Sequence, residues 1–406
     1  MFTDTQHATP SSNAALTEAG VTPDAGTLLS RFGTASSFFM ATPELTLHGI
    51  GVRDQLHTGA DQSMEDALQR LFALNREHGD ASSIAVGALP FAADAPAVLF
   101  IPERLELAGR LERRGAPPAG PAVGGAATQE RPSRERYAQG VAQALGMMRQ
   151  SGLKKVVLSR MLEVVGEHDI DQARLLRNLA ANNLSGYTFA LNLQSETRSI
   201  RRLIGASPEL LLRRRGINLE ANPIAGTAPR SRDPGEDLSH SRRLLHSAKD
   251  RHEHALVVEA VADALGPFCS ALEVPPIPEL IATARVWHLS TRIRGVLRDR
   301  ESSSLTLARA LHPTPAVCGE PRELARQAIA RLECFDRGLF TGLVGWCAAN
   351  GDGEWAVTIR CAEIEANRAN LYAGAGIVPD SQPWQEVDET SAKFRTLLDA
   401  LHGSRP

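Results

Sequence analysis

The 406-residue sequence predicts an α+β fold, and two patterns indicate this class. Short segments of alternating, β-branched or aromatic residues recur from residue 137 onwards, as expected of strands that bury one face. Helical patterns lie between them, but the strands come in runs without the strict strand–helix alternation of a doubly wound sheet. Enzymes of mixed sheets and helices often close as one unit at this length, so we expect a single large domain.

Composition divides the chain into four regions. Residues 1–30 are polar, small and without period, and we expect a flexible tail. Residues 31–115 form the N-terminal portion of the fold. Residues 116–133 are rich in Pro and Gly, which predicts a loop that neither continues a helix nor pairs in a sheet. Residues 134–406 form the core of the domain.

The core region supplies most of the expected elements. Strands are predicted at residues 155–165, 187–193, 202–207, 217–226, 286–297, 342–349, 355–364 and 370–378. Helices are predicted at residues 135–152, 171–183, 239–265 and 383–403. The third helix stops at Gly266-Pro267, and the last has Pro383 in its first turn and Gly403 at its end, which are ordinary helix boundaries.

Charge and cysteine content exclude several classes of protein. Lys and Arg number 44 against 47 Asp and Glu, a net charge of −3, which provides no basic surface for nucleic acid. The first residues lack the pattern of a secretory signal, and no apolar run is long enough to span a bilayer. The five cysteines are widely spaced and form no CxxC pair. We therefore expect a cytoplasmic protein that does not act in a membrane.

Two helices carry acidic pairs at a spacing of three residues. Asp250 and Glu253 lie on the helix at 239–265, and Glu386 and Glu389 lie on the last helix. Residues three apart share one helix face, so each pair points in one direction. A solvated surface is the commoner explanation of one such pair. Two pairs that meet could instead supply the hard oxygen ligands that Mg²⁺ prefers, and spacing alone does not decide between these alternatives.

Eight motifs in one order carry a family resemblance. The chain resembles the chorismate-utilising enzymes, which include isochorismate, salicylate, anthranilate and aminodeoxychorismate synthases. The motifs are KVVLSR (155–160), GASPELLLR (205–213), PIAGTAPR (223–230), SAKDRHEHALVV (247–258), LHPTPAVCGEP (311–321), GLFTGLVGW (338–346), IRCAEI (359–364) and AGAGIVPDSQPWQEVDETSAK (373–393). Segments 38–52 and 87–103 are similar to the isochorismate synthase branch. The resemblance implies antiparallel sheets wrapped by helices, with a catalytic core around a central cleft.

The resemblance implies an isomerase that adds water to C2 of chorismate and removes the hydroxyl from C4. Such a reaction needs a base, an acid and charge neutralisation. Lys155 is similar to the family's general base, which must first lose its own proton. Glu209 is similar to the general acid, which must stay protonated at neutral pH through burial or adjoining negative charge.

The resemblance also implies the residues that bind metal and substrate. Glu253 and Glu389 are implied as direct Mg²⁺ ligands, with Asp250 and Glu386 acting through bound water. Arg360 and the amides around Gly374 and Gly376 are similar to a clamp for the enolpyruvyl carboxylate. The remaining implied pocket residues are Gly226, Thr227, His312, Phe340, Ile359 and Lys393; His312 also has a purely structural explanation.

Three positions favour isochorismate as the product. Aminodeoxychorismate synthases usually have a nucleophilic Lys where this chain has Ala225, which cannot attack a ring carbon. Salicylate-forming relatives usually have Tyr in place of Phe340 and Leu in place of Ile359. We expect an isochorismate synthase of the siderophore type, as a monomer. A salicylate synthase, a menaquinone-pathway isochorismate synthase and a protein that binds chorismate without turnover are the alternatives.

Overall fold

The structure is a computed structural model that describes residues 23–56, 63–77, 83–112, 120–183, 185–197 and 199–404. The described strands form three sheets, and every pairing between them is antiparallel. The prediction of an α+β fold with antiparallel sheets is confirmed.

The first sheet has ten strands within the described residues, and β7 pairs with β8 beside the main order. That order is β18 (Gly319–Glu320), β8 (Lys155–Gly166), β22 (Arg368–Ile377), β21 (Cys361–Glu365), β10 (Arg201–Ser207), β9 (Tyr187–Leu193), β1 (Ser36–Ala41), β2 (Leu45–Ile50) and β6 (Arg104–Gly109), while β7 is Ala126–Arg131.

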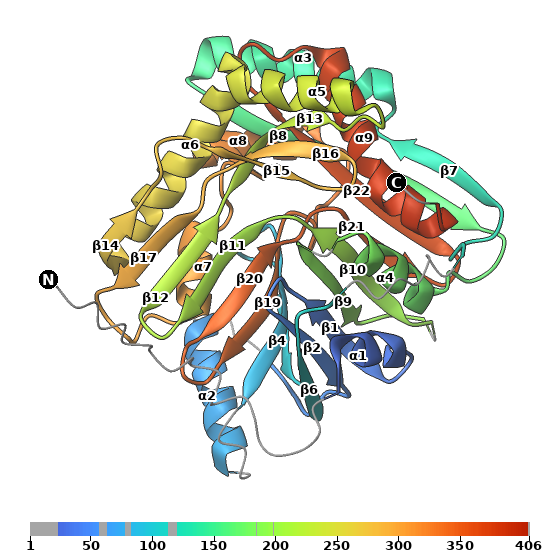
Figure 1. Cartoon of the computed structure of the whole chain (residues 1–406), viewed down its shortest axis with the longest axis vertical. Helices are drawn as coiled ribbons and strands as arrows, with labels where there is room; N and C mark the ends of the chain where they lie inside the picture. The colour runs from blue at the N-terminus through green and yellow to red at the C-terminus, as the bar shows by residue number, and fades with distance from the viewer. Residues whose placement is uncertain are drawn as a thin grey trace, which may run out of the picture.

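The second sheet has nine strands in the described part of the chain, and the third is small. The second runs β14 (Cys269–Glu273), β17 (Ile293–Leu297), β12 (Asn218–Asn222), β11 (Leu210–Arg215), β20 (Gly353–Val357), β19 (Leu343–Ala348), β4 (Ile84–Leu89), β5 (Val98–Ile101) and β3 (Asp54–Gln55). The third runs β13 (Ile224–Pro229), β16 (Val286–Ser290) and β15 (Glu279–Ala282), and it lies beneath α5 in Figure 1.

Helices cover the outer faces of the two large sheets (Figure 1). They are α1 (Ala25–Arg31), α2 (Met64–Glu77), α3 (Arg134–Ser151), α4 (Gln172–Ala181), α5 (Pro234–His246), α6 (Ala248–Leu265), α7 (Ser304–Leu311), α8 (Arg322–Leu332) and α9 (Pro383–His402), and a 3-10 turn follows α6 at Gly266–Phe268. Among the described residues, no helix combines the length and the hydropathy needed to cross a bilayer.

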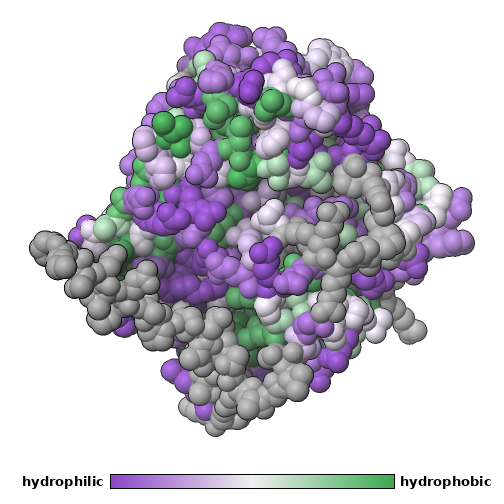
Figure 2. Space-filling model, in the orientation of Figure 1, coloured by the Kyte–Doolittle hydropathy of each residue, from purple (hydrophilic) through white to green (hydrophobic). Residues whose placement is uncertain are grey.

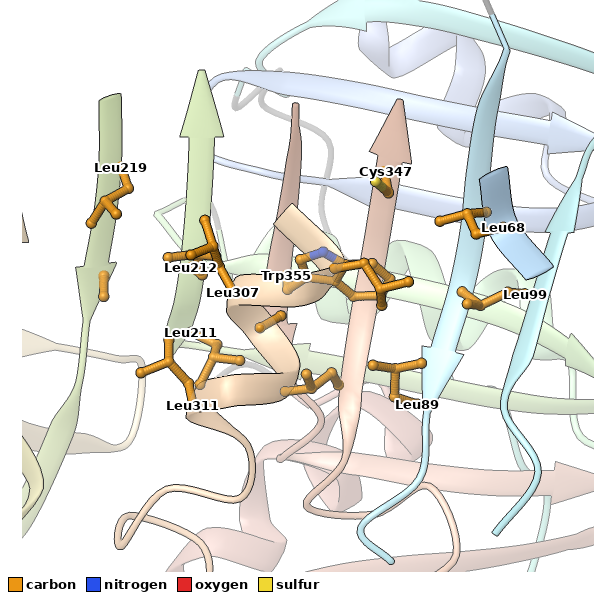
Figure 3. Packing of buried hydrophobic residues seen from close by; sticks show 14 of the residues in the cluster. Leu68, Leu89, Leu99, Leu211, Leu212, Leu219, Leu307, Leu311, Cys347 and Trp355 are labelled. Atoms are coloured by element: carbon orange, nitrogen blue, oxygen red, sulfur yellow. The ribbon is translucent and has the colours of Figure 1, made fainter. Parts of the chain in front are cut away.

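Apolar side chains form layers on both sides of each large sheet. Residues of β1, β4, β10 and β19 pack together between the two sheets. On the outer face of the second sheet, α2, α6 and α7 cover a cluster around Trp355, which Figure 3 shows beside Leu307 and Leu212. Hydrophilic side chains dominate the surface seen in Figure 2, and apolar ones gather where α5 and α6 lie. The packing follows from strand alternation, which sends successive side chains to opposite faces.

The N-terminal third is an integral part of both large sheets. Strand β1 pairs with β9, and β4 pairs with β19 from the far end of the chain. The predicted loop at 116–133 therefore does not separate two units. The predicted tail was also too long: residues 1–22 lie outside the described residues, but α1 begins at Ala25 and buries Leu28.

The prediction that residues 116–133 do not pair in a sheet is wrong for residues 126–131. These residues form β7 along the edge of β8. The Pro and Gly residues that motivated the prediction are concentrated before residue 126 and at Pro132, so they flank the strand rather than interrupt it. Residues 113–119 lie outside the described part.

The helix predicted at 239–265 is two helices. The backbone of Ser247 is extended, with φ −66° and ψ 116°, and its side chain accepts a hydrogen bond from the backbone N–H of Asp250. Ser247 thus ends α5 and caps α6. In the acidic pair of α6, Glu253 is buried and Asp250 is half-buried. The last helix begins with Pro383 and ends at Gly403 in the left-handed conformation, as predicted.

Replacing Leu307 with Ala is expected to lower the free energy of unfolding by roughly 2–5 kcal/mol, because Leu307 is fully buried and a cavity would remain. Leu74→Ala is the matched control, since Leu74 is 53% exposed. Urea unfolding of both variants measures the difference. Equal losses in the two variants would contradict the described packing of α7.

Candidate active site

The chain crosses between the two large sheets at two adjacent points, and each crossing carries a predicted site residue. Glu209 lies between β10 and β11, and Arg360 lies between β20 and β21. The backbone N–H of Ala206 donates to the Arg360 carbonyl at 3.0 Å, and that of Val357 donates to the Glu209 carbonyl at 3.1 Å. Main-chain hydrogen bonds therefore fix the positions of both residues.

Lys155 is fully buried at the start of β8. Its Nζ lies 2.9 Å from Oε1 of Glu253 on α6, in an ion pair without hydrogen-bond geometry, and Nζ has no hydrogen-bond partner among the described residues. Gly376 of β22 leaves room for this pair, because a Cβ there would lie 2.1 Å from Glu253 Oε1 and 3.0 Å from Lys155 Cε. Gly376 therefore lies at the edge of the site, and a larger residue there would displace Glu253 or Lys155.

Glu209 is a buried carboxyl group that stays protonated at neutral pH. Burial raises its pKa to about 8, although the charges of Lys155, Arg360 and Lys393 lower it. The desolvation of a fully enclosed carboxylate outweighs the attraction of these cations. The group can therefore donate a proton at neutral pH, as a general acid must.

The carboxylates of α6 and α9 face one another. Burial raises the pKa of Asp250, and the charges of Glu253 and Glu389 raise it further. Burial and the charge of Glu389 raise the pKa of Glu386 to about 7, even though Lys249 opposes this shift. Because carboxylates from two helices disfavour each other's ionisation, they form one acidic cluster and not two solvated surfaces.

Lysines hold three of the four carboxylates in this cluster. The ion pairs are Lys155–Glu253 at 2.9 Å, Lys249–Glu386 at 2.8 Å and Lys393–Glu389 at 2.6 Å. Within the described residues, no group of three or more His, Cys, Asp or Glu side chains is arranged to hold a metal ion. The ion pairs explain the absence of such a group, because carboxylates that point toward lysines do not point toward one common metal position.

Arg360 is a buried cation without a carboxylate partner among the described residues. Its side chain is almost fully enclosed, and burial lowers its pKa to about 10, so it remains protonated at neutral pH. Its backbone φ of +51° is unusual for a residue with a side chain. The guanidinium Nη2 lies 3.3 Å from His288 Nε2. An enclosed guanidinium of this kind can bind an anion that enters the site.

The small sheet contributes Gly226 and Thr227 next to the acidic cluster. Gly226 has φ +75° at a β-bulge of β13, and a Cβ there would lie 3.0 Å from the Cβ of Asp250, so glycine suits both the bulge and the contact. The Oγ1 of Thr227 lies 3.1 Å from Nδ1 of His288. Both residues therefore border the site, as the resemblance implied.

Lys393 and Gly374 form the opposite wall. The Lys393 ammonium donates to the Gly374 carbonyl at 2.7 Å and to Glu389 at 2.6 Å. A Cβ at Gly374 would lie 2.6 Å from the Ser159 Oγ of β8. The missing side chain again allows close approach of neighbouring strands and helices.

Three predicted pocket residues have their described contacts elsewhere. The Nε2 of His312 donates to the Pro90 carbonyl, 3.2 Å away, and burial lowers the pKa of His312 to about 4. Phe340 stacks on Tyr372 with ring centroids 5.0 Å apart. Ile359 packs against the apolar core. These contacts are structural, and none of them joins these residues to the acidic cluster.

A pocket lies against Arg360. It is lined by the end of α4, the turn between β15 and β16, and α9, and its lining includes Asn182, Ala206, Ala284 and Thr396. Beside it, the Arg285 Nε donates to Asp399 at 2.7 Å, which ties the β15–β16 turn to α9.

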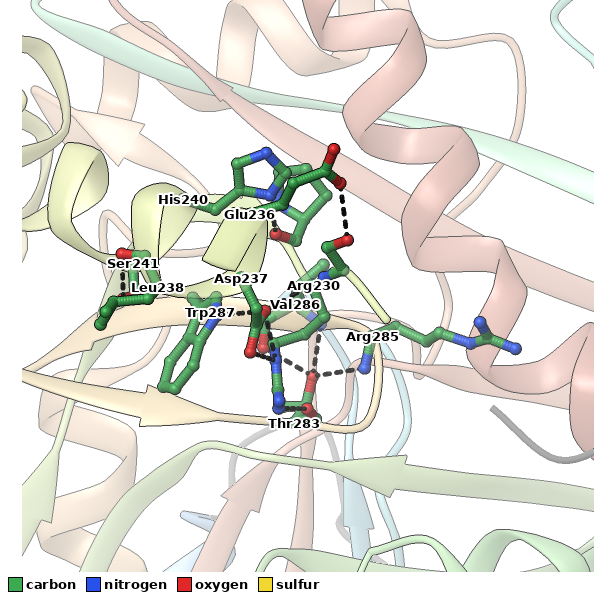
Figure 4. Close-up of polar contacts among 12 residues, drawn as sticks. Arg230, Glu236, Asp237, Leu238, His240, Ser241, Thr283, Arg285, Val286 and Trp287 are labelled. Carbon is green, nitrogen blue, oxygen red and sulfur yellow. Dashed lines mark hydrogen bonds and ion pairs between the residues drawn. The ribbon is translucent and has the colours of Figure 1, made fainter. Parts of the chain in front are cut away.

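The hairpin of β15 and β16 is held from outside by a polar network (Figure 4). The Arg230 Nε lies 2.8 and 2.9 Å from the two oxygens of Asp237, and the Trp287 Nε1 donates to Asp237 at 2.9 Å. Arg230 also donates to the Thr283 carbonyl at 3.2 Å. This network fixes the strand that carries His288.

Sequence reasoning missed two residues of this site, His288 and Lys249. His288 stands in the predicted strand 286–297, where a single histidine carries no spacing signal. Lys249 directly precedes Asp250 in the motif SAKDRHEHALVV, but a lysine beside an acidic residue does not indicate a partner on another helix.

Comparisons with known proteins agree on one family. The family of chorismate binding enzymes matches residues 101–402. The chain is 46% identical to the isochorismate synthase DhbC of Bacillus subtilis and 45% identical to the vibriobactin-specific isochorismate synthase of Vibrio cholerae, over 90% of this chain and 93% and 92% of those proteins. Its structure is similar to that of a putative 2,3-dihydroxybenzoate-specific isochorismate synthase, DhbC from Bacillus anthracis, with TM-score 0.89, 46% identity and coverage of 93% and 99% of the two chains.

Glu209→Gln is expected to stabilise the protein at neutral and alkaline pH. The carboxyl has a pKa of about 8 when folded, against an ordinary value of 4.5, so the folded state keeps a proton that the unfolded chain releases. Stability is therefore lost as pH rises from about 4.5 to about 8, by on the order of 3 kcal/mol at pH 7, and a neutral amide avoids this loss.

Urea unfolding of the native chain and Glu209→Gln between pH 5 and 9 measures this effect. Glu259→Gln, which removes a carboxylate from an exposed position of α6, is the control. If Glu209→Gln is no more stable than the native chain at pH 8, the buried carboxyl is not held in its neutral form.

Proposed function

The chain belongs to the family of chorismate binding enzymes, and on this basis we propose that it is an isochorismate synthase, an isomerase that converts chorismate to isochorismate. The relatives at 45–46% identity that span nearly the whole chain carry this activity in their names. The observation within the site that carries the proposal is Glu209, a fully buried acid with a pKa of about 8 beside the buried amine of Lys155.

The reaction exchanges a hydroxyl group without oxidation or reduction. A water oxygen bonds to C2, the ring double bond shifts, and the C4–oxygen bond breaks. Lys155, as a free amine, takes a proton from the attacking water, and Glu209 gives its proton to the departing hydroxyl, which leaves as water. The proton gained by Lys155 balances the proton lost by Glu209. Because Glu253 Oε1 lies 2.9 Å from Lys155 Nζ, these two groups must separate before Lys155 can take a proton from water.

The remaining cations bind and orient the substrate. Arg360 offers a planar set of donors to a carboxylate, and its side chain is already largely buried beside a pocket. Lys393 adds positive charge beside Gly374. The β-bulge at Gly226 and Thr227 borders the acidic cluster, where a ring carboxylate would lie. Chorismate carries two carboxylates, so an enclosed pair of cations matches its charge.

We include Mg²⁺ in this proposal because the donor set fits it. Glu253 and Glu386 are buried, and Asp250 and Glu389 are half-buried. Burial and neighbouring carboxylates raise the pKa of Asp250 and of Glu386, so this cluster needs a compensating charge, and hard oxygen donors are those that Mg²⁺ prefers. Glu253 and Glu389 would hold the ion directly, and Asp250 and Glu386 would act through water. The bound ion would neutralise the ring carboxylate. Lys155, Lys249 and Lys393 occupy these carboxylates in the present arrangement and would have to turn away.

Three residues support isochorismate over related products. Ala225 has no nucleophile that could replace water. Phe340 and Ile359 are the residues at which salicylate-forming relatives usually differ, and both lie in tightly packed surroundings. Replacing Phe340 with Tyr would add a hydroxyl group to a ring that is stacked on Tyr372 and 1% exposed.

The names of the relatives favour a role in siderophore biosynthesis, and we propose that the enzyme works in the cytoplasm as a monomer. The five cysteines are free, and four of them are buried, which agrees with a reducing compartment.

Incubation of the purified chain with chorismate and Mg²⁺, followed by chromatography, is expected to yield isochorismate as the only product. Lys155→Ala should fold normally and lose turnover, since it removes the proposed base. Arg149→Ala, at an exposed position near the end of α3, is the control and should keep normal rates. Salicylate plus pyruvate would replace the proposed product with that of a salicylate synthase. Binding of chorismate without conversion would favour a non-catalytic protein.

Removing divalent cations with a chelator is expected to abolish turnover, and added Mg²⁺ to restore it. Affinity for Mg²⁺ should rise as pH increases through about 7, because Glu386 must release the proton that burial and Glu389 help it retain. Glu386→Gln should weaken Mg²⁺ binding about 10–100-fold and flatten this pH dependence.

Asp388→Asn is the matched control for Glu386→Gln, because Asp388 lies on the same helix with its side chain 76% exposed. Calorimetric titration with Mg²⁺ measures both variants. Full turnover in the presence of the chelator would rule out the metal from the proposed mechanism.

A further inference from the structure

We propose that His288 is a positioning residue that holds the guanidinium of Arg360 ready for a substrate carboxylate. The inference deepens the proposed function and rests on it for the identity of the ligand. His288 lies on β16 and is 4% exposed. It contacts both Arg360 and the β-bulge of β13 at Gly226 and Thr227, and so connects two walls of the site.

The partners of the two ring nitrogens determine where the proton of His288 lies. Its Nδ1 is 3.2 Å from the Gly226 carbonyl, which can only accept a hydrogen bond, and 3.1 Å from Thr227 Oγ1. Its Nε2 is 3.3 Å from Nη2 of Arg360, which can only donate. Nδ1 therefore carries the hydrogen and Nε2 accepts from Arg360. No other protonation state satisfies both contacts.

The surrounding charges stabilise this neutral form. Burial lowers the pKa of His288 well below its ordinary value, and the positive charges of Arg360 and Lys393 lower it further. A protonated ring would direct an N–H at the N–H of Arg360 and lose the hydrogen bond. His288 therefore acts as a fixed acceptor rather than as an acid or a base.

The strand holds the ring from the opposite face. Successive side chains of a strand point to opposite sides, so Trp287 and His288 face in opposite directions. Trp287 donates to Asp237, which also binds Arg230 (Figure 4). The Arg230 guanidinium lies over the Trp287 ring, 4.6 Å from its centroid. The outer network thus fixes the inner histidine.

Arg360 needs such a partner because the described residues give it no carboxylate. An arginine side chain has several rotatable bonds, and ordering it at the moment of binding would weaken affinity. His288 takes one N–H of the guanidinium and leaves others for the substrate. Because the held carboxylate does not react, this role predicts an effect on substrate binding much larger than the effect on the chemical step.

Two amide substitutions separate the two nitrogens of His288. In His288→Gln the longer side chain places its amide near Nε2, and its oxygen can accept from Arg360. In His288→Asn the amide reaches only the position of Nδ1, so it can donate to Gly226 but leaves Arg360 without an acceptor. Both side chains are polar and uncharged, so both should fold. His48→Asn is the control, because His48 is 1% exposed and contacts Ser36 and Glu106.

For the conversion of chorismate, His288→Asn is expected to raise KM about tenfold or more with kcat within about threefold, and His288→Gln should stay within about threefold of the native chain. In an Arg360→Lys background, His288→Asn should have little further effect on KM, because the guanidinium that His288 positions is absent. Equal losses in the Asn and Gln variants, a fall in kcat alone, or an undiminished effect in the Arg360→Lys background would each overturn the proposal.

Nitrogen NMR of protein with ¹⁵N-labelled histidine tests the same inference without any reaction. His288, assigned by the signal lost in His288→Gln, is expected to show a protonated Nδ1 and an unprotonated Nε2 at pH 7. The opposite tautomer or a doubly protonated ring would refute the assignment. A native chain with the expected tautomer but no conversion of chorismate would instead reject the proposed function and leave the His288–Arg360 hydrogen bond in place.

Discussion

The burial of many charges in one place is the constraint on which the rest of this structure depends. Carboxylates of α6 and α9 would repel one another without lysines from β8, α6 and α9 to hold them. Burial raises the pKa of Glu209 and lowers that of Arg360. In the described part of the chain, Arg360 forms no ion pair with a carboxylate. Rigid sheets and helices supply the geometry, because a loose site would admit water and remove these effects.

Three buried glutamates of the site differ in their surroundings, although their side chains are the same. Glu253 forms an ion pair with Lys155, whose Nζ lies 2.9 Å from its Oε1. Glu209 has cations nearby, but burial prevails and keeps its proton. Glu386 lies between these cases, with a pKa of about 7, because Lys249 and Glu389 act on it in opposite directions. Glu209 and Glu386 therefore differ in pKa although their side chains are the same, because their burial and charged neighbours differ.

The sequence predicted the fold class, the acidic pairs and their shared helix faces, because period and spacing are local properties. It could not predict that Ser247 divides a helix, since the apolar pattern runs through the break. It also could not predict that Arg360 lies in a left-handed turn between two sheets, within a segment that reads as one strand. The pairing of Lys249 with Glu386 and of His288 with Arg360 joins distant segments, and a single sequence carries no signal for such contacts. For His312 the motif left both a pocket role and a structural role open, and its described contact is with the Pro90 carbonyl.

The pairing of β4 with β19 has a consequence for synthesis on the ribosome. Strand β4 is made early, but one of its two neighbours is not complete until residue 348, and β8 must wait for β22 until residue 377. The second sheet cannot close before residue 357 has been made, and the first cannot close before residue 377, so early strands emerge with unpaired edges that attract other chains. The arrangement that encloses the site therefore exposes the nascent chain to aggregation until β20 and β22 have left the ribosome.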